Sequence, residues 1–190
     1  SITIHEDQAF VSCGFGIIVI NLIKGEISST YYIGNEGEQL EVFETAIFNY
    51  DSIFAATAKG VRKAFVRHPN LENYRFWEDV VGLPHAMDSY THLAALEGQL
   101  FAAHRSPNNA LDSIFVYDGH HWASFPWSYK DIREMCFNQG NLLTTSEFQV
   151  NLMTPGGERL WHLKTYGFDF LRANDAIFDE SETLWIADEL

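Results

Sequence analysis

Histidine is the residue type in this 190-residue chain whose spacing first suggests chemistry, because eight histidines are present and imidazole is a common metal ligand. His120 and His121 are adjacent and follow Asp118-Gly119. Adjacent residues of a strand point to opposite faces, so this pair cannot bind one ion without a bend, and Asp-Gly is a common hairpin turn. His92 and His104 are expected at strand ends, in capping or exposed roles. We therefore expect no metal and no cofactor.

The sequence also lacks the usual signatures of catalysis. No nucleophile elbow, zinc motif, phosphate loop or Cys-His arrangement stands out. Asp7, Asp51 and Asp179 fit β-turn positions and lack the ligand spacing of a calcium loop. Cys13 and Cys136 fall in different repeats, so two free thiols are expected rather than a disulfide. These features favour a protein that is not an enzyme.

Charge and composition exclude several classes of protein. The chain has 12 Lys and Arg against 26 Asp and Glu, a net charge of −14, which argues against nucleic acid and anionic membranes as partners. Hydrophobic residues make up 46% and aromatics 15%, which is typical of a packed all-β protein. The longest apolar run, residues 16–20, is too short for a membrane helix. No signal peptide is visible, and the chain opens at Ser1 inside a strand-like pattern, which suggests a processed product or an excised piece.

The elements that must position these side chains come from an internal repeat. An aromatic residue or Leu, followed by small or β-branched residues, recurs at intervals of 42 to 47 residues, at Phe10, Phe54, Phe101, Leu143 and Trp185. A short apolar run and a polar turn precede each copy, and the three together predict a β-hairpin. Two more strand-like runs follow in the first four copies. This period and strand number are typical of a β-propeller blade.

The prediction is therefore an all-β fold, a β-propeller of four four-stranded blades plus the first hairpin of a fifth, as part of a larger propeller. One segment, residues 1–190, contains blades at approximately 1–43, 44–89, 90–132 and 133–173, with a partial blade at 174–190. In the second repeat the fourth strand is expected at residues 75–77. A β-sandwich is the remaining alternative, but it would not explain five copies of one motif.

Two expectations about packing follow from the repeat. Phe54, Phe101 and Trp185 occupy the same place in their repeats, so they should pack between neighbouring blades. An interrupted ring should leave two apolar faces uncovered: that of the first repeat, with Ile17, Val19 and Tyr31, and that of the fifth, with Ile177 and Trp185. The remaining blades of a full-length protein should cover them. As an isolated piece, the chain should self-associate.

Some segments resemble known propellers. The acidic turn after residue 178 and the run Leu184-Trp185-Ile186 resemble the blade signature of the two-component-regulator propeller family, although Glu189 stands where that signature has Asn or Gly. Residues 31–37, 53–61, 70–74 and Trp77 are similar to PorZ-type surface propellers of the bacterial type IX secretion system. That resemblance implies a location at the cell surface or in the periplasm, associated with the outer membrane. It also implies a protein that helps deliver anionic lipopolysaccharide to secreted cargo.

Propeller geometry indicates where a ligand would bind. Loops joining second to third strands, and those joining successive blades, share one face around the channel mouth. The candidate ligand-binding residues in these loops are Phe15, Lys59, His92, Arg105, Arg133, Glu147 and Arg172, with Lys130 beside them. Basic residues are scarce in the chain, with 12 Lys and Arg in all, and several lie in these loops, so an anionic partner such as a sugar acid or a peptide carboxylate would suit this face. Ordinary loop polarity would also account for them.

Three functional hypotheses remain. The first is a non-catalytic binding and assembly module of a bacterial cell-surface or periplasmic protein, with a protein or an anionic saccharide as partner. The alternative is the ligand-sensing propeller of a two-component regulator that binds an oligosaccharide. The third, a propeller hydrolase or lyase, needs carboxylates or His clustered at the channel mouth, and the sequence alone identifies no such cluster.

Overall fold

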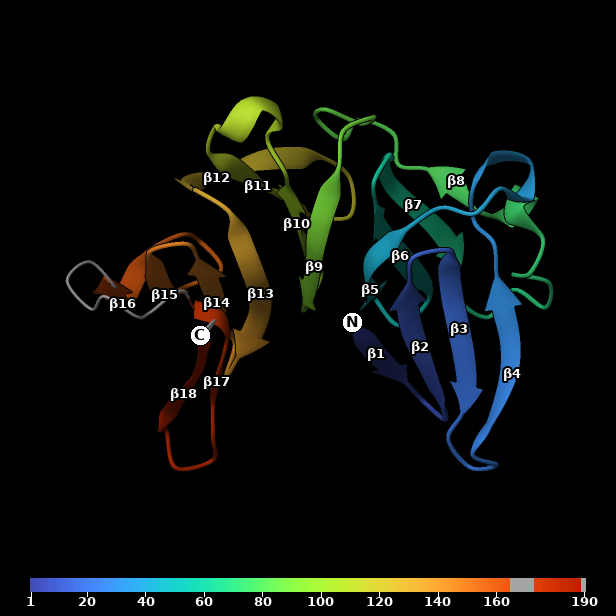
Figure 1. Cartoon of the computed structure of the whole chain (residues 1–190), viewed down its shortest axis with the longest axis horizontal. Helices are drawn as coiled ribbons and strands as arrows, with labels where there is room; N and C mark the ends of the chain where they lie inside the picture. The colour runs from blue at the N-terminus through green and yellow to red at the C-terminus, as the bar shows by residue number, and fades with distance from the viewer. Residues whose placement is uncertain (165–172, 189–190) are drawn as a thin grey trace.

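The computed structural model describes residues 1–164 and 173–188. Their regular structure is almost entirely β-strand, in sheets that follow one another along an open arc in chain order (Figure 1). Four sheets have four antiparallel strands and a fifth has two. The predicted fold is confirmed: four propeller blades and the first hairpin of a fifth. In the described ranges, no helix has the length and apolar character to span a membrane.

Each blade is a meander, so the order of strands in space is their order in sequence. The first blade contains β1 (Ile2–His5), β2 (Gln8–Cys13), β3 (Gly16–Asn21) and β4 (Glu26–Tyr31). The second contains β5 (Val42–Phe48), β6 (Ser52–Thr57), β7 (Gly60–Phe65) and β8 (Glu78–Asp79). The third contains β9 (Tyr90–Leu96), β10 (Gln99–His104), β11 (Asp112–Tyr117) and β12 (Trp122–Tyr129). The fourth contains β13 (Ile132–Asn138), β14 (Asn141–Ser146), β15 (Gln149–Met153) and β16 (Arg159–Lys164), and the last hairpin contains β17 (Ala173–Phe178) and β18 (Leu184–Asp188). Three short 3₁₀ helices lie in connections: η1 (Asn35–Gly37), η2 (Tyr74–Phe76) and η3 (Pro107–Asn109).

The first hairpin of each blade forms because its turn residues accept positive φ. Gln139 and Gly140 join β13 to β14 with φ of 47° and 78°. Glu97 and Gly98 do the same between β9 and β10, with φ of 33° and 81°. Two successive positive φ values match the right-handed twist of the flanking strands, as in a type I′ turn. The first strand of each blade (β1, β5, β9, β13 and β17) lies beside its counterpart in the next blade, so these innermost strands line the inner side of the arc, which we call the channel wall (Figure 1).

A separate hydrophobic cluster fills each junction between successive sheets. Phe10, Phe54 and Phe101 face the following blade and are 0%, 2% and 0% exposed, which confirms the expected packing of Phe54 and Phe101. Trp185 occupies the same place but is 61% exposed, so the prediction is wrong for this residue. The leading side chain of each motif packs against the sheet that follows its own blade. The structure describes no sheet after β17 and β18, so Trp185 has no such neighbour.

The apolar face left open on the first blade is the opposite of the predicted one. Ile17, Val19 and Tyr31 were expected on an uncovered face, but they are 0%, 0% and 7% exposed at the junction with the second blade. Val19 pairs with Phe10 across β2 and β3, so the two side chains share the face that meets the next blade. The uncovered face instead carries exposed isoleucines of β1 and β4, namely Ile2, Ile4 and Ile27. At the other end, Ile177 and Trp185 are exposed as predicted.

The fourth strand of the second blade also differs from the prediction. Residues 74–76 form η2 rather than a strand, because the Asn73 side chain accepts a hydrogen bond from the Arg75 amide and caps the turn. Trp77 is 4% exposed, and its indole N–H donates to the Leu71 carbonyl at 3.0 Å. The edge strand is the short β8, which pairs with β7. A buried Trp therefore anchors the segment that the sequence pattern assigned to an edge strand.

Candidate functional site

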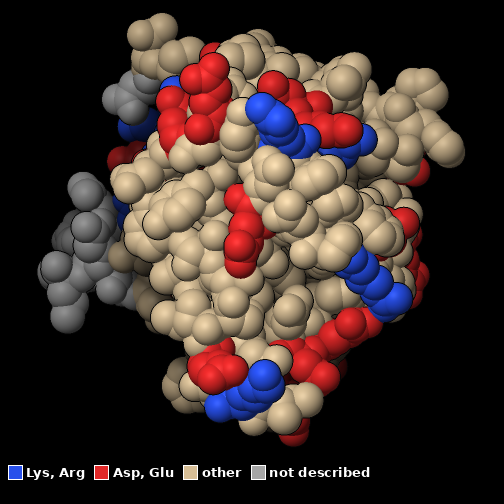
Figure 2. Space-filling view, turned by 90° about the vertical axis from the view of Figure 1, so that its right-hand side faces the viewer, with Lys and Arg blue, Asp and Glu red and all other residues tan. Residues whose placement is uncertain are grey.

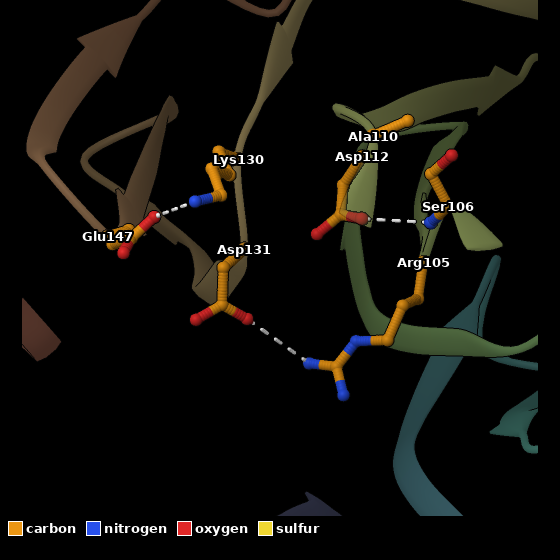
Figure 3. Close-up of a pocket in the computed structure, with 7 residues that line it drawn as sticks. All are labelled: Arg105, Ser106, Ala110, Asp112, Lys130, Asp131 and Glu147. Atoms are coloured by element: carbon orange, nitrogen blue, oxygen red, sulfur yellow. Dashed lines mark hydrogen bonds and ion pairs between the residues drawn. The ribbon is translucent and has the colours of Figure 1, made fainter. Parts of the chain in front are cut away.

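A pocket opens between the third and fourth blades, at the end of the blades that carries the candidate loops (Figure 3). We call this end the top face. The pocket has a volume of about 370 Å³ and is lined by Arg105, Ser106, Ala110, Asp112, Lys130, Asp131 and Glu147. Arg105, Ser106 and Ala110 come from the β10–β11 connection, Lys130 and Asp131 from the β12–β13 connection, and Glu147 from the β14–β15 turn. The structure thus brings together two predicted site residues, Arg105 and Glu147, and the neighbouring Lys130.

A buried aspartate fixes the shape of this pocket. Asp112, the first residue of β11, is 4% exposed and accepts two backbone hydrogen bonds. One comes from the Ser106 amide at 2.8 Å and the other from the Ile132 amide at 2.9 Å. One carboxylate therefore holds the β10–β11 connection of the third blade against the first residue of the fourth. The pocket walls are positioned by hydrogen bonds across the blade junction.

The charges inside the pocket are paired with one another. Lys130 Nζ lies 2.9 Å from Glu147 Oε2, and Arg105 Nη2 lies 3.6 Å from Asp131 Oδ1 (Figure 3). With Asp112, the pocket holds three carboxylates and two cations. Arg105 and Lys130 remain about half exposed, at 49% and 44%. The site is therefore a polar pocket of alternating charge.

The other predicted site residues lie outside this pocket. Phe15 is half-buried against Tyr32, with ring centroids 6.1 Å apart. Lys59 pairs with Glu38 at 3.1 Å on the second blade. Arg172 lies outside the described residues. The predicted loop residues therefore do not form one continuous basic ring. On the side of the molecule formed by the first two blades, basic side chains lie next to acidic ones (Figure 2).

Arg133 lies beside the pocket. Its Nε is 3.0 Å from Asp131 Oδ2, the carboxylate that also faces Arg105. Its Nη1 donates to Asn174 Oδ1 on β17 at 2.7 Å. Arg133 thus connects the pocket rim to the last hairpin. Its contacts give it a positioning role at the junction of the fourth and fifth sheets.

His92 belongs to a second polar group, on the channel wall. Glu44, His92, Glu134 and Asp175 occupy equivalent places on the innermost strands of four successive sheets. Each pairs with the third residue of the recurring motif: Ala56, Ala103, Thr145 and Ala187, respectively. In each sheet the register shifts immediately before this residue. A β-bulge is a common device for changing the direction of a side chain near a functional site.

The channel-wall residues interact electrostatically. His92 Nδ1 lies 3.4 Å from Glu44 Oε2, which also accepts the Leu93 amide at 2.9 Å. Burial raises the pKa of Glu134, and the charges of Glu44 and Asp175 raise it further, while His92 opposes them. Burial, followed by the same three carboxylates, raises the pKa of the Cys136 thiol to about 12. Cys13 and Cys136 are both free thiols. The channel wall thus concentrates negative charge, which suits a proton or a cation better than an anion.

Sequence reasoning identified His92 but missed its three acidic counterparts. A signal was present: Glu44, His92, Glu134 and Asp175 each precede the leading residue of their motif by nine or ten positions. This spacing did not reveal a shared face, because the β-bulges interrupt the alternation of side chains from which the face of a strand residue is predicted. The carboxylates Asp112 and Asp131 carried no comparable signal. They become part of the pocket only when two blades meet.

Comparison with known proteins gives one family match. Residues 1–78 match the family model described as the N-terminal β-propeller domain of PorZ of the type IX secretion system. No curated protein sequence matches the chain. The matched residues correspond to the first two blades. The predicted resemblance to PorZ-type propellers is thereby confirmed for this part of the chain.

Solved structures resemble the chain over nearly its whole length. PorZ, an essential surface component of the type IX secretion system of Porphyromonas gingivalis, has a TM-score of 0.72 at 16% identity, covering 98% of this chain and 23% of that one. The extracellular domain of a putative hybrid two-component system from B. thetaiotaomicron has a TM-score of 0.70 at 11% identity, covering 100% and 25%. A gluconolactonase from Xanthomonas campestris has a TM-score of 0.65 at 16% identity, covering 95% and 65%.

These likenesses establish the propeller fold. This chain spans about a quarter of the length of the PorZ and two-component structures. The three proteins are a secretion component, the extracellular domain of a signalling protein and an enzyme. The fold alone therefore does not select a function, which has to be argued from the sites.

Proposed function

We propose that this chain is a non-catalytic binding and assembly module of a bacterial cell-surface or periplasmic protein linked to type IX secretion. The observation that carries this proposal is the match of residues 1–78 to the PorZ N-terminal propeller domain. The overall similarity to PorZ, a surface component of that system, supports the same assignment. The net charge of −14 disfavours nucleic acid as the partner.

The pocket of Figure 3 is the proposed binding site, with an acidic saccharide or a peptide carboxylate as ligand. Arg105 and Lys130 are half exposed, and ion pairs of that kind contribute only about 0 to 1 kcal/mol. A ligand carboxylate can therefore replace Asp131 at Arg105, where both partners are exposed, with little loss, while Glu147, which is 18% exposed, keeps its pairing with Lys130. The nearby carboxylates would accept hydrogen bonds from sugar hydroxyls. This arrangement favours a ligand that carries both an acid and several hydroxyl groups.

A titration tests the site. Sodium D-glucuronate is added to the isotopically labelled chain, and amide chemical shifts are followed by NMR, with D-glucose as the uncharged counterpart. We expect saturable shifts around residues 105–112 and 130–131 with glucuronate, and their loss in the double variant Arg105→Ala, Lys130→Ala. Lys24→Ala is the control, because it removes an exposed, ion-paired lysine from the β3–β4 turn. Equal shifts in both variants, or none with either sugar, would contradict the proposed site.

The non-catalytic part of the proposal has its own test. The gluconolactonase among the similar structures and the carboxylates on the channel wall make lactone hydrolysis the activity to examine. We expect glucono-δ-lactone to open at the uncatalysed rate in the presence of the chain. A rate that is proportional to protein concentration and is lost in Glu134→Gln would identify an enzyme instead.

A second candidate function is ligand sensing in a two-component regulator. It is favoured by the similarity, over the whole chain, to the extracellular domain of the two-component protein. Reading the complete gene decides between the two. A membrane helix followed by a kinase domain would support the sensor, and its absence from the complete gene would support the assembly module.

A further inference from the structure

A cluster of two histidines and an aspartate lies outside both sites described above. His85 and Asp88 belong to the connection between β8 and β9, and His104 is the last residue of β10. His104 Nε2 lies 3.0 Å from Asp88 Oδ2, and His85 Nδ1 lies 3.8 Å from the same oxygen. One ligand atom from each residue lies within 4.8 Å of the other two. Among residues 1–164 and 173–188, this is the one group of three His, Cys, Asp or Glu side chains gathered so closely.

The loop that carries two of these residues is held in place by its backbone. The Gly60 amide donates to the Asp88 carbonyl at 2.8 Å, and the Asp88 amide donates to the His85 carbonyl at 2.9 Å. Gly60 has φ of +93°, and a Cβ there would lie 2.1 Å from the Ala86 carbonyl oxygen. Only glycine allows the loop to approach the β6–β7 turn this closely. The backbone positions of His85 and Asp88 are therefore fixed relative to each other by the fold.

The third residue is set by packing. His104 is 4% exposed and its ring lies 5.4 Å from that of Tyr90 and 6.2 Å from that of Phe115. The His85 ring stacks on the His104 ring, with centroids 4.6 Å apart and planes inclined by 15°. One wall of the cluster is thus apolar and fixed. The other is open, since the side chains of His85 and Asp88 are 58% and 42% exposed.

We propose that His85, Asp88 and His104 bind a divalent transition-metal ion of the Zn²⁺ class. Two imidazole nitrogens and a carboxylate oxygen form a ligand set that suits zinc, whereas Ca²⁺ and Mg²⁺ prefer oxygen ligands alone. Tetrahedral zinc with bonds of about 2.1 Å separates its ligand atoms by about 3.4 Å. The observed separations of 3.0 and 3.8 Å lie on either side of that value. Because the two rings are stacked, the exposed His85 ring would have to rotate so that its Nδ1 lone pair points at the ion beside His104 Nε2.

Such an ion would have two consequences for the molecule. It would join the β8–β9 connection to β10, and so fasten the chain segment between the second and third blades to the third blade. Three protein ligands also leave a coordination position free on the exposed side. A donor atom from a ligand or a partner protein can occupy that position. This site is separate from the pocket of Figure 3, so the test of zinc binding does not depend on whether the proposed function is correct.

Zinc binding to the tag-free chain tests the proposal. The chain is treated with chelator, dialysed and titrated with Zn²⁺ in competition with a chromophoric chelator. We expect one equivalent to bind, and about 100-fold weaker binding in His85→Ala, because loss of a direct ligand should cost at least as much as loss of an outer-shell partner. His85 is the residue to change first because it is exposed and should not be needed for folding. The matched control is His120→Ala, His121→Ala, which removes two exposed histidines from the β11–β12 turn.

Two further measurements make the outcome decisive. In EDTA, the melting temperatures of the wild-type chain and of His85→Ala should agree, and Zn²⁺ should raise only that of the wild type. Co²⁺ should give tetrahedral absorption bands in the wild type and the control but not in Asp88→Asn. Equal weakening in His85→Ala and the control, or no binding by the wild type at micromolar zinc, would overturn the site.

Discussion

The junction between the first and second blades and the junction between the fourth blade and the last hairpin use the same strand pattern but are packed differently. The first is a cluster of thirteen buried hydrophobic residues that includes Phe10, Tyr31 and Trp77. Within the part of the chain that the structure describes, the last contains four: Leu143, Val150, Ala173 and Ala176. Since hydrophobic stabilisation grows with the apolar area removed from water, the first junction should be the stronger.

The first junction also differs from the junction between the third and fourth blades in its buried polar groups. At the first, Arg62 is 5% exposed and its guanidinium donates to the Ile33 carbonyl at 2.8 Å and the Asn35 side chain at 2.5 Å. It also pairs with Asp79 at 3.1 Å. The Arg62 Nε has no partner among the described residues. At the junction between the third and fourth blades, the whole side-chain amide of the fully buried Asn151, on the same face as Met153, makes no hydrogen bond within the described ranges. The same is true of Thr144 Oγ1 on the neighbouring strand.

The family match covers the two blades that meet at the first junction. Residues 1–78, which match the PorZ propeller domain, form the two blades joined by the aromatic cluster and by Arg62. A junction that depends on particular aromatic rings and on one buried cation tolerates few substitutions. A junction of small and branched aliphatic residues tolerates many.

The largest expected effect comes from comparing two tryptophans. Trp77→Ala should lower the free energy of unfolding by about 3 to 5 kcal/mol, since it removes a buried ring and its hydrogen bond to Leu71. Trp185→Ala should cost less than about 1 kcal/mol, because that ring is exposed on the outermost strand. Urea unfolding followed by circular dichroism measures both. Similar costs for the two variants would mean that Trp185 is covered in solution.

A substitution in the fourth blade is expected to increase stability, by a smaller amount. Asn151→Leu should raise the free energy of unfolding by about 1 kcal/mol, because it replaces a buried amide without a partner among residues 1–164 and 173–188 by an apolar side chain of similar size. Asn70→Leu, in an exposed loop of the second blade, is the control and should give no gain. Urea midpoints at constant slope report the difference. Destabilisation by Asn151→Leu would show that the amide is hydrogen-bonded in solution.

The third prediction concerns the two uncovered faces rather than the junctions. Ile2, Ile4 and Ile27 at one end and Ile177 and Trp185 at the other expose apolar side chains, so the chain should self-associate at micromolar concentration. Trp185→Glu should shift the sedimentation coefficient toward the monomer. Tyr50→Glu, which changes an exposed aromatic residue in the β5–β6 turn, should not. A wild-type chain that sediments as a monomer and binds no ANS would refute this prediction.

The smallest effect is a pH dependence from the channel wall. Folding raises the pKa of Glu134 above its ordinary value of 4.5. Such an acid makes the folded protein less stable as the pH rises from 4.5 through the raised pKa. Glu134→Gln should therefore be more stable than the wild type at pH 7, and the advantage should shrink toward pH 4. The groups responsible besides burial are Glu44, His92 and Asp175, all retained in the variant. Thermal unfolding at both pH values measures the change, and an advantage that does not vary with pH would contradict it.

The sequence predicted the blades because each blade is a local object. A run of strand residues, a turn with two positive φ values and a second run lie within about fifteen residues of one another, and that signal repeats along the chain. The leading positions Phe54 and Phe101 were likewise predicted as buried, since a recurring aromatic residue has no other use in every blade. The top-face loops followed from the connectivity alone, and two of the residues predicted there, Arg105 and Glu147, do line one pocket.

Only the tertiary structure decided which way these elements face and what they meet. The alternation of a strand defines two faces but not which one meets the next blade, so Val19 was assigned to the wrong side and Trp185 to a junction. Bulges directed Glu44 and Glu134 to equivalent places on the channel wall. His85 and His104 are separated by a whole hairpin and come together only when the β8–β9 connection folds onto β10. Local sequence determines strands and turns because these depend on interactions between residues that are close in the chain. The sites depend on contacts between blades, and the residues in contact lie tens of positions apart in the sequence.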